Sequence, residues 1–263
     1  MNGAVTLRRD GGAAWITLER PAALNALDTA AKQGLLDALT EVAGDPAVRA
    51  VALTGSGRAF CVGQDLRELS ALYESGETPD FRARLEEHYN PIVRLLSGMA
   101  KPTVACVNGV AAGAGLSLAL ACDLRLASSA ASFTLAFTGI GLIPDAGATW
   151  HLPRLIGLGP ALELALLNER IDAGEALRLR LVGRVWPAET FQDEAAATVA
   201  RLAAGATGAF GLAKRLLRES QNLELAAALD AEAAAQAEAG VSADHAEGVA
   251  AFLAKRPPAF EGR

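Results

Sequence analysis

The stretch from Thr103 to Cys122 constrains the fold most, because it runs for twenty residues without a charged side chain. A segment of that length and composition could cross a bilayer as one helix. It contains Asn108-Gly109 and the glycines Gly113 and Gly115, however, and Pro102 precedes it. Because these residues favour turns and interrupt helices, we expect a buried strand, a turn and a buried helix inside a globular core.

Strand-like and helix-like segments alternate along the first part of the chain. Short, apolar, β-branched runs predict strands at Ala13–Leu18, Val48–Thr54, Thr103–Val107 and Asp123–Ala127. Apolar residues at helical spacing predict a helix over Asp28–Ala43, with Asp28 as its N-cap. This alternation is typical of an α/β body.

From about Phe191 onward the pattern is helical only. The expected helices are Thr198–Ala204, Gly208–Glu219, Leu223–Ala239 and Ala243–Lys255. We therefore divide the chain into an α/β core, residues 1–195, and a C-terminal helical region, residues 196–263. The segment Ser70–Asp80 has the composition of a loop.

Charge and cysteine content narrow the function. The formal net charge is −6, aromatic residues make up 5%, and basic runs are absent, which argues against nucleic-acid binding. Cys61, Cys106 and Cys122 lack the spacing of a disulfide framework or a metal site and lie in apolar runs, so we expect buried thiols in a reducing compartment. The polar start, Met1–Asp10, is unlike a signal peptide. We expect a cytoplasmic protein with no membrane segment and no metal ion.

Two glycine-rich turns could place backbone N–H groups beside a ligand. In Gly55–Leu66, Gly63 has no Cβ and lets the backbone approach a ligand, so the N–H of Gln64 would point into that space. In Asn108–Cys122 a helix begins near Gly115, with unpaired N–H groups at the positive end of its dipole. A carbonyl oxygen held there would be stabilised as it becomes an oxyanion. The structural alternatives are an ordinary turn and close helix–strand packing.

A third turn, Gly139–Leu152, contains Asp145 directly after Pro144 and before a helix expected to start near Ala146. Aspartate is a common N-cap, and the spacing alone favours that role. The alternative is a carboxylate aimed into a pocket, where it could act as an acid or a base.

In this order, and over nearly the whole chain, these segments resemble the crotonase (enoyl-CoA hydratase/isomerase) superfamily. The matching motifs are RPAALNAL at Arg20–Leu27, AFCVGQDL at Ala59–Leu66, NGVAAG at Asn108–Gly113 and AFLAKR at Ala251–Arg256. The resemblance implies a spiral of ββα turns with a C-terminal helical trimerisation region. It also implies a homotrimer or a dimer of trimers.

The resemblance implies a binding site for an acyl-CoA thioester. It carries the oxyanion hole onto the N–H groups of Gln64 and Ala114. The residues implied to line the CoA-binding strip are Ala22, Leu24, Val62, Gly63, Gln64, Asp65, Leu66 and Gly113. Phe252 and Lys255 would reach the adenosine end of CoA from a neighbouring subunit. Since CoA is part of the substrate, no separate cofactor is expected.

The resemblance also bears on the reaction. Hydratases of the family use two glutamates, and the corresponding positions here are Ser117 and Phe137. A serine and a phenylalanine cannot activate water as a carboxylate pair does, so efficient hydration is not expected. Asp145 remains as the acid/base of a proton-transfer isomerisation.

Three further stretches resemble one branch of the family, the phenylacetate-pathway isomerases of ring-1,2-epoxyphenylacetyl-CoA. They are Tyr89–Arg94, Ala136–Trp150 followed by Leu152–Arg154, and Gly240–Val249. Val62 and Ala148 depart from that branch without removing a polar group. We expect an isomerase of this kind, or a close relative in aromatic or fatty acid catabolism. The alternatives are an enoyl-CoA hydratase of low or unusual specificity and a non-catalytic acyl-CoA-binding subunit.

Overall fold

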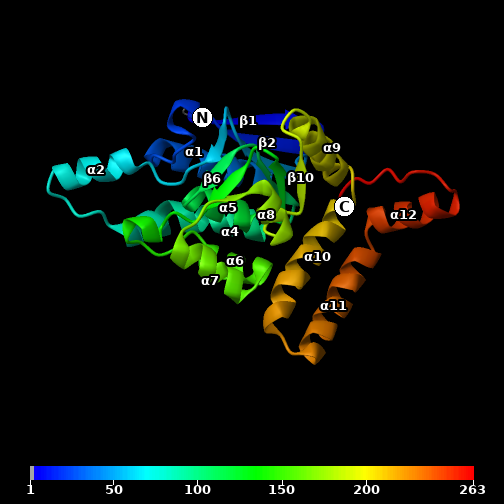
Figure 1. The fold of residues 1–263 in the computed structure, drawn as a ribbon. Coiled ribbons are helices and arrows are strands. Elements are labelled where there is room, and N and C mark those ends of the chain that lie inside the picture. Colours follow the sequence, from blue (N-terminus) through cyan, green and yellow to red (C-terminus); the bar gives the residue numbers. More distant parts are fainter. Residues whose placement is uncertain (1–2) are drawn as a thin grey trace.

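A six-stranded sheet forms the larger layer of the protein, whose residues 3–263 are described by the computed structural model (Figure 1). In spatial order its strands are β1 (Val5–Asp10), β2 (Ala13–Leu18), β3 (Ala50–Gly55), β5 (Thr103–Val107), β7 (Leu124–Ser128) and β10 (Arg184–Trp186). β1 is antiparallel to β2, and the other neighbours are parallel.

A second sheet of four short strands lies beside the first. Its order is β4 (Ala59–Cys61), β6 (Val110–Ala112), β8 (Ser132–Thr134) and β9 (Ile171–Asp172). The first three are parallel, and β9 is antiparallel to β8.

The chain visits both sheets in each turn of a spiral. β3 and β4 precede α2 (Leu66–Glu74), β5 and β6 precede α5 (Ala114–Ala121), and β7 and β8 precede α6 (Ala148–Ile156). Each turn therefore adds one strand to each sheet and then a helix. This confirms the predicted α/β fold and its ββα spiral.

The remaining helices of the body surround these sheets. They are α1 (Thr29–Gly44), α3 (Phe81–Arg84), α4 (Asn90–Gly98), α7 (Leu158–Leu167) and α8 (Ala173–Arg178), with 3-10 turns at Pro21–Ala23 and Thr138–Ile140 and a π-helical turn at Leu85–Tyr89. Asp28 caps α1, accepting a hydrogen bond from the N–H of Ala31 at 2.7 Å, as predicted. All eight residues of α5 are buried, and six of them belong to the core of aliphatic side chains.

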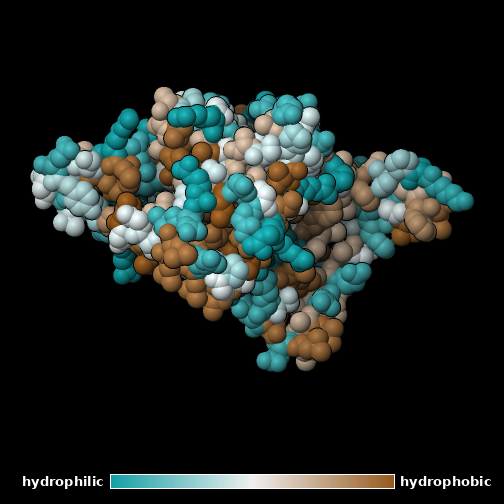
Figure 2. Space-filling model, viewed as in Figure 1, coloured by the Kyte–Doolittle hydropathy of each residue, from teal (hydrophilic) through white to brown (hydrophobic). Residues whose placement is uncertain are grey.

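The C-terminal helices are α9 (Phe191–Ala203), α10 (Thr207–Glu219), α11 (Leu225–Gly240) and α12 (Ala243–Leu253), with a 3-10 turn at Ser220–Asn222. α9 packs Phe191 and Val199 against the larger sheet, so the boundary predicted at residue 196 falls inside a helix that belongs to the body. α10 and α11 form a hairpin that projects away from the sheets (Figure 1). Apolar side chains are exposed over α7 and near the free end of that hairpin (Figure 2).

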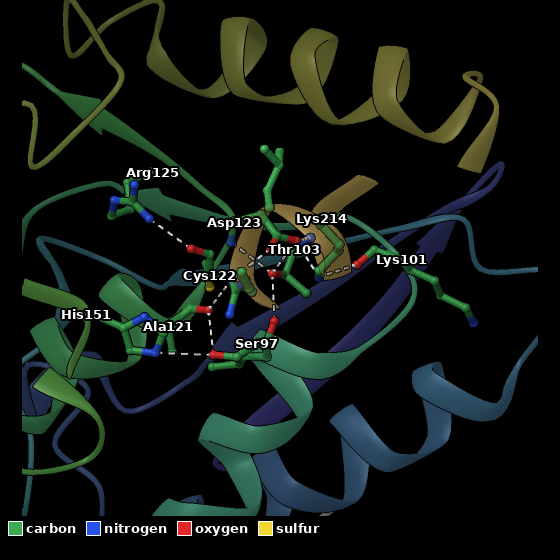
Figure 3. Close-up of polar contacts among 12 residues, drawn as sticks. Ser97, Lys101, Thr103, Ala121, Cys122, Asp123, Arg125, His151 and Lys214 are labelled. Carbon is green, nitrogen blue, oxygen red and sulfur yellow. Dashed lines mark hydrogen bonds and ion pairs between the residues drawn. The ribbon is translucent and has the colours of Figure 1, made fainter. Parts of the chain in front are cut away.

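Asp123 joins the hairpin to the body (Figure 3). Its Oδ2 accepts hydrogen bonds from the N–H of Thr103 at 2.8 Å and from Nζ of Lys214 on α10 at 2.6 Å. Its Oδ1 accepts from Arg218 at 2.9 Å. Two cations of α10 are thus bound to one half-buried carboxylate at the start of β7.

The uncharged stretch of twenty residues is β5, β6 and α5 rather than one helix, because the chain turns at Asn108 and again at Gly113. Among residues 3–263, no single helix is both long and apolar enough to cross a membrane; α9 and the following helical stretch, residues 207–222, meet that criterion only as a pair, which is bent by 99°.

One sequence-based expectation about local structure was wrong, and one strand was not predicted. The loop expected at Ser70–Asp80 is helical as far as Glu74, because α2 continues through Ser70. The polar N-terminal segment, for which no strand was predicted, contains the edge strand β1, which pairs along its whole length with β2 and buries only Val5.

Candidate active site

The loop after β4 is held so that one peptide N–H points away from its neighbours. Leu27 donates its N–H to the carbonyl of Gly63 at 2.7 Å and accepts from the N–H of Asp65 at 3.1 Å. In such a parallel bridge the residue between them, Gln64, directs its own N–H to the opposite side. No described group accepts a hydrogen bond from that N–H.

The opposite side of the loop is the N-terminus of α5. Gly63 has φ +86°, and a Cβ on it would lie 2.9 Å from the amide nitrogen of Ala114. A Cβ on Gly115 would overlap the carbonyl oxygen of Cys61. Glycine at these two positions is therefore what lets the loop and the helix approach so closely.

Ala114 is the first residue of α5 and follows Gly113, whose φ of +53° ends the turn. Its N–H has no intrahelical acceptor and lies at the positive end of the helix dipole. The N–H groups of Gln64 and Ala114 thus face one space from two segments. Two such donors can hold a carbonyl oxygen that gains negative charge.

A pocket of about 780 Å³, counted to its open mouth, lies in front of this pair. Its apolar lining is Val62, Leu66, Leu69, Phe81, Leu85, Gly113, Ala114, Ala136, Phe137, Ile140 and Leu142. The polar lining is Gln64, Arg84, Tyr89 and Asp145. Six of the residues predicted for the site, namely Val62, Gln64, Leu66, Gly113, Ala114 and Asp145, are therefore brought together.

Asp145 is not a helix cap, and that expectation was wrong. Ala146 and Gly147 both adopt positive φ, 48° and 82°, so α6 begins only at Ala148 with Gly147 at its N-cap position. The Asp145 side chain is thereby turned into the pocket instead of toward the helix N–H groups. Its Oδ1 is buried without a hydrogen-bond partner among the described residues. Burial raises the pKa of the carboxyl to about 6.

The side chain of Gln64 is fixed by a polar cluster that sequence analysis missed. Its Oε1 accepts hydrogen bonds from Nζ of Lys32 at 3.1 Å and from the hydroxyl of Tyr89 at 3.0 Å. Its Nε2 donates to Glu68 at 3.1 Å. Lys32 is 1% exposed, and burial lowers the pKa of its ammonium. The sequence contained one sign of this cluster, because Lys32 lies on the same face of the predicted helix Asp28–Ala43 as Leu35 and Leu39.

His88 lies beside this cluster. Its side chain is half-buried, and Nδ1 has no partner among the described residues. Burial and the nearby Lys32 ammonium lower the pKa of the imidazole.

Asp65 and the RPAALNAL segment support the loop from behind the pocket. Asp65 caps α2 through the N–H of Arg67 and forms an ion pair with Arg20 at 2.9 Å. Burial would raise the pKa of its carboxyl, but these two contacts outweigh it and the pKa is lowered. Ala22 lies in the 3-10 turn that follows Arg20, and Leu24 comes directly after that turn. Neither residue lines the pocket.

Phe252 and Lys255 lie far in space from the pocket of their own chain. Both are exposed on or just after α12, and Phe252 is 82% exposed. α12 stands at the opposite end of the molecule from α2, whose Leu66 and Leu69 line the pocket (Figure 1). Neither residue lines its own chain's pocket.

The two positions at which hydratases carry glutamate hold no carboxylate. Ser117 is fully buried, and its hydroxyl donates to the carbonyl of Gly113 at 3.3 Å. Phe137 is 6% exposed and presents an apolar wall to the pocket. Asp145 is the one carboxylate among the described residues that line the pocket.

His151 and the cysteines lie apart from this pocket. The Nε2 of His151 is 3.3 Å from the hydroxyl of Ser97, and burial lowers the pKa of the imidazole to about 4 (Figure 3). Cys61, Cys106 and Cys122 are buried and free, as predicted. No cluster of three or more His, Cys, Asp or Glu side chains suited to a metal ion occurs within residues 3–263.

A family model described as enoyl-CoA hydratase/isomerase matches residues 8–263 of the chain. The chain belongs to the enoyl-CoA hydratase/isomerase family. The chain is 45% identical over 252 residues to a probable enoyl-CoA hydratase of Rhodobacter capsulatus, covering 96% of this chain and 95% of that one. It is 42% identical over 252 residues to the 1,2-epoxyphenylacetyl-CoA isomerase of Escherichia coli, covering 96% of each.

Solved structures of the family share the whole fold. The enoyl-CoA hydratase of Bacillus anthracis superposes with a TM-score of 0.91 at 32% identity, covering 99% of this chain and 100% of that one. Members of the enoyl-CoA hydratase/isomerase family act on acyl-CoA thioesters. Relatives named for hydration and for isomerisation stand at similar identity, so the choice between the two reactions depends on the groups in the pocket.

Proposed function

We propose that this family member is a CoA-ester isomerase in which Asp145 is the acid/base and the N–H groups of Gln64 and Ala114 form the oxyanion hole. The observation that carries the proposal is the Asp145 carboxylate, which lines the pocket and whose buried Oδ1 has no hydrogen-bond partner among residues 3–263. The positions of the hydratase glutamates are occupied by Ser117 and Phe137. The pocket thus offers one group for proton transfer and no carboxylate pair for water.

The proposed reaction moves a proton within the acyl group. The thioester carbonyl oxygen accepts hydrogen bonds from the two N–H groups. Asp145 takes a proton from carbon, the electron pair of that C–H bond enters the acyl π-system, and negative charge collects on the carbonyl oxygen. Asp145 then returns the proton to a different carbon. Each donor of such a hole contributes about 3 kcal/mol to the transition state, and a carboxyl pKa near 6 suits proton transfer at neutral pH.

The finer identity that we propose is a 2-(1,2-epoxy-1,2-dihydrophenyl)acetyl-CoA isomerase or a close relative in aromatic or fatty acid catabolism. The 42% identity to the Escherichia coli 1,2-epoxyphenylacetyl-CoA isomerase supports it. The apolar walls, including Phe137 and Leu142, suit a ring or an unsaturated chain.

A second candidate is an enoyl-CoA hydratase of unusual specificity. The 45% identity to the Rhodobacter capsulatus protein, named as a probable enoyl-CoA hydratase, favours it. Asp145 would then have to activate water alone.

Asp145→Asn tests the proposal, with Asp37→Asn on the exposed face of α1 as the matched control. We expect the Asp145 variant to lose turnover of the ring epoxide ester and deuterium uptake into bound unsaturated esters, while CoA-ester affinity stays within a few-fold of wild type. Turnover at the control's rate would refute the assignment. Hydration of crotonyl-CoA faster than isomerisation would favour the second candidate. Affinity without any proton exchange in the wild type would indicate a non-catalytic binder.

We further propose that the chain assembles as a homotrimer or a dimer of trimers, with Phe252 and Lys255 reaching a neighbour's CoA. The exposed apolar side chains of the C-terminal helices, among them Leu225 and Leu253 at 74% and 75%, support an assembled state (Figure 2). Light scattering on the full chain would give the mass. A monomer at micromolar concentration would refute the assembly.

A further inference from the structure

Among the described residues, Arg84 is the one polar side chain of the pocket that neither takes part in the proposed reaction nor forms a hydrogen bond with another side chain of the lining. The side chains of Gln64 and Tyr89 are hydrogen-bonded to each other, and Asp145 carries the proton. Arg84 ends α3 and lines the pocket beside the apolar side chain of Leu85. Its side chain is 23% exposed.

The guanidinium of Arg84 forms no hydrogen bond with another described group. Its one ionic neighbour is Glu68, with Nη1 and Oε2 separated by 3.9 Å. That carboxylate is occupied by other donors, because it accepts from the N–H of Thr29 at 2.8 Å and from Gln64 at 3.1 Å and lies 4.0 Å from Lys32. A guanidinium has five N–H donors in a fixed plane. Arg84 therefore presents donors that bind no other described group at the wall of a mainly apolar pocket.

The charges of the pocket lining indicate what those donors would bind. Arg84 and Asp145 carry the charges among the lining side chains, one of each sign. A carboxylate on the acyl group would add a second anion to the cavity that contains Asp145. A neutral ether, epoxide or hydroxyl oxygen accepts a hydrogen bond without adding charge.

We propose that Arg84 is a specificity-determining residue that binds a neutral oxygen atom on the acyl group of the substrate. The acyl group then has an apolar body against Phe81, Leu85 and Leu142, and one oxygen acceptor directed toward α3. This inference rests on the proposed function only in placing the acyl group of a CoA ester in this pocket. It names the substrate class as oxygen-bearing, uncharged acyl groups and excludes plain hydrocarbon chains and dicarboxylic acyl groups as preferred substrates.

Binding of matched, unreactive thioesters tests the proposal without any turnover. Cyclohexylacetyl-CoA is compared by calorimetry with its oxan-2-yl, oxan-3-yl and oxan-4-yl counterparts, in which one ring methylene is an ether oxygen. A hydrogen bond to a charged donor predicts about tenfold tighter binding of at least one oxane ester to the wild type. Arg84→Met should remove that preference and leave cyclohexylacetyl-CoA affinity within about twofold. Arg82→Met is the matched control, since Arg82 is exposed on the same helix and pairs with Glu86.

Each contrary outcome overturns the inference. No oxane preference in the wild type, or a preference that survives in Arg84→Met, would show that Arg84 does not bind the acyl oxygen. If Arg84→Met lost as much affinity for CoA alone as for the oxane esters, Arg84 would bind the CoA moiety and not the acyl group. Tighter binding of adipyl-CoA than of any oxane ester would assign it to a carboxylate. Because no esters react, failure of Asp145→Asn to stop turnover would refute the proposed function and leave this result unaffected.

Discussion

Replacing Gly63 by alanine should separate the two N–H groups without unfolding the protein. The new Cβ would lie 2.9 Å from the nitrogen of Ala114 and 3.1 Å from the carbonyl oxygen of Ala112. Ordinary contact begins at 3.4 Å, so the first distance requires a displacement of 3.4 − 2.9 = 0.5 Å. Both neighbours are backbone atoms, so no side-chain rotation can relieve the contact.

The displacement acts on the atoms that would hold the thioester oxygen. Loss of one well-placed oxyanion donor costs about 10²–10³ in kcat, or about 3 to 4 kcal/mol. We expect Gly63→Ala to lower kcat by about 100-fold with a small change in KM, since the pocket walls stay in place. The positive φ of +86° adds about 1–3 kcal/mol of backbone strain, which lowers Tm by several degrees.

Gly76→Ala is the matched control. Gly76 has a similar φ of +80°, but nothing lies within 4 Å of its would-be Cβ. It should therefore show the strain in Tm and keep wild-type kcat. Steady-state kinetics on an unsaturated or epoxidised CoA ester, with thermal unfolding of each variant, make the comparison. If Gly63→Ala retains full kcat, or if Gly76→Ala lowers kcat as much as Gly63→Ala does, then the contact of the added Cβ with Ala114 does not determine the geometry of the oxyanion hole.

Three further predictions follow from the polar contacts. Because burial raises the pKa of Asp145 to about 6, kcat/KM should fall as pH drops through about 6. The stability that the protonated Asp145 carboxyl contributes is fully present below its unfolded pKa and is lost as pH rises through about 6. Asp145→Asn should therefore gain Tm relative to wild type at pH 8 but not at pH 4. Lys32→Met removes a charged hydrogen bond to the side chain of Gln64, so it should cost about 1–3 kcal/mol of stability and lower kcat more than it raises KM. An unchanged kcat would show that the Gln64 side chain does not position the Gln64 peptide N–H. Asp123→Ala leaves Lys214 and Arg218 without their shared carboxylate and should destabilise the protein by about 3 kcal/mol, measured by thermal unfolding. A Tm equal to that of the wild type would show that Asp123 does not attach α10 to the body.

Much of the fold follows from local patterns in the sequence. β2 and β5 have the predicted bounds, and Asp28 caps α1, because hydrophobic runs and capping residues act over a few neighbouring positions. The short strands β4 and β6 were missed. Their three residues carry no periodic signal, and their existence depends on pairing with each other across a long separation in the chain.

The candidate site divides in the same way. The glycines that allow a close approach and the absence of hydratase glutamates are properties of the sequence, and the family resemblance located Gln64, Ala114 and Asp145 in it. The sequence did not reveal that Lys32, Glu68 and Tyr89 meet at the side chain of Gln64, with Arg84 beside Glu68, because these residues come from α1, α2, α3 and the π-helical turn at Leu85–Tyr89.

Asp145 shows most clearly what each level decides. By itself the sequence determined that a carboxylate follows Pro144 just before a helix, and spacing favoured a cap. Only the tertiary structure decided its role in the fold, because positive φ at Ala146 and Gly147 delays the helix and turns the side chain into the pocket. A backbone angle at a non-glycine residue such as Ala146 is fixed by the packing around it, and Ala146 is buried. No local pattern encodes that packing.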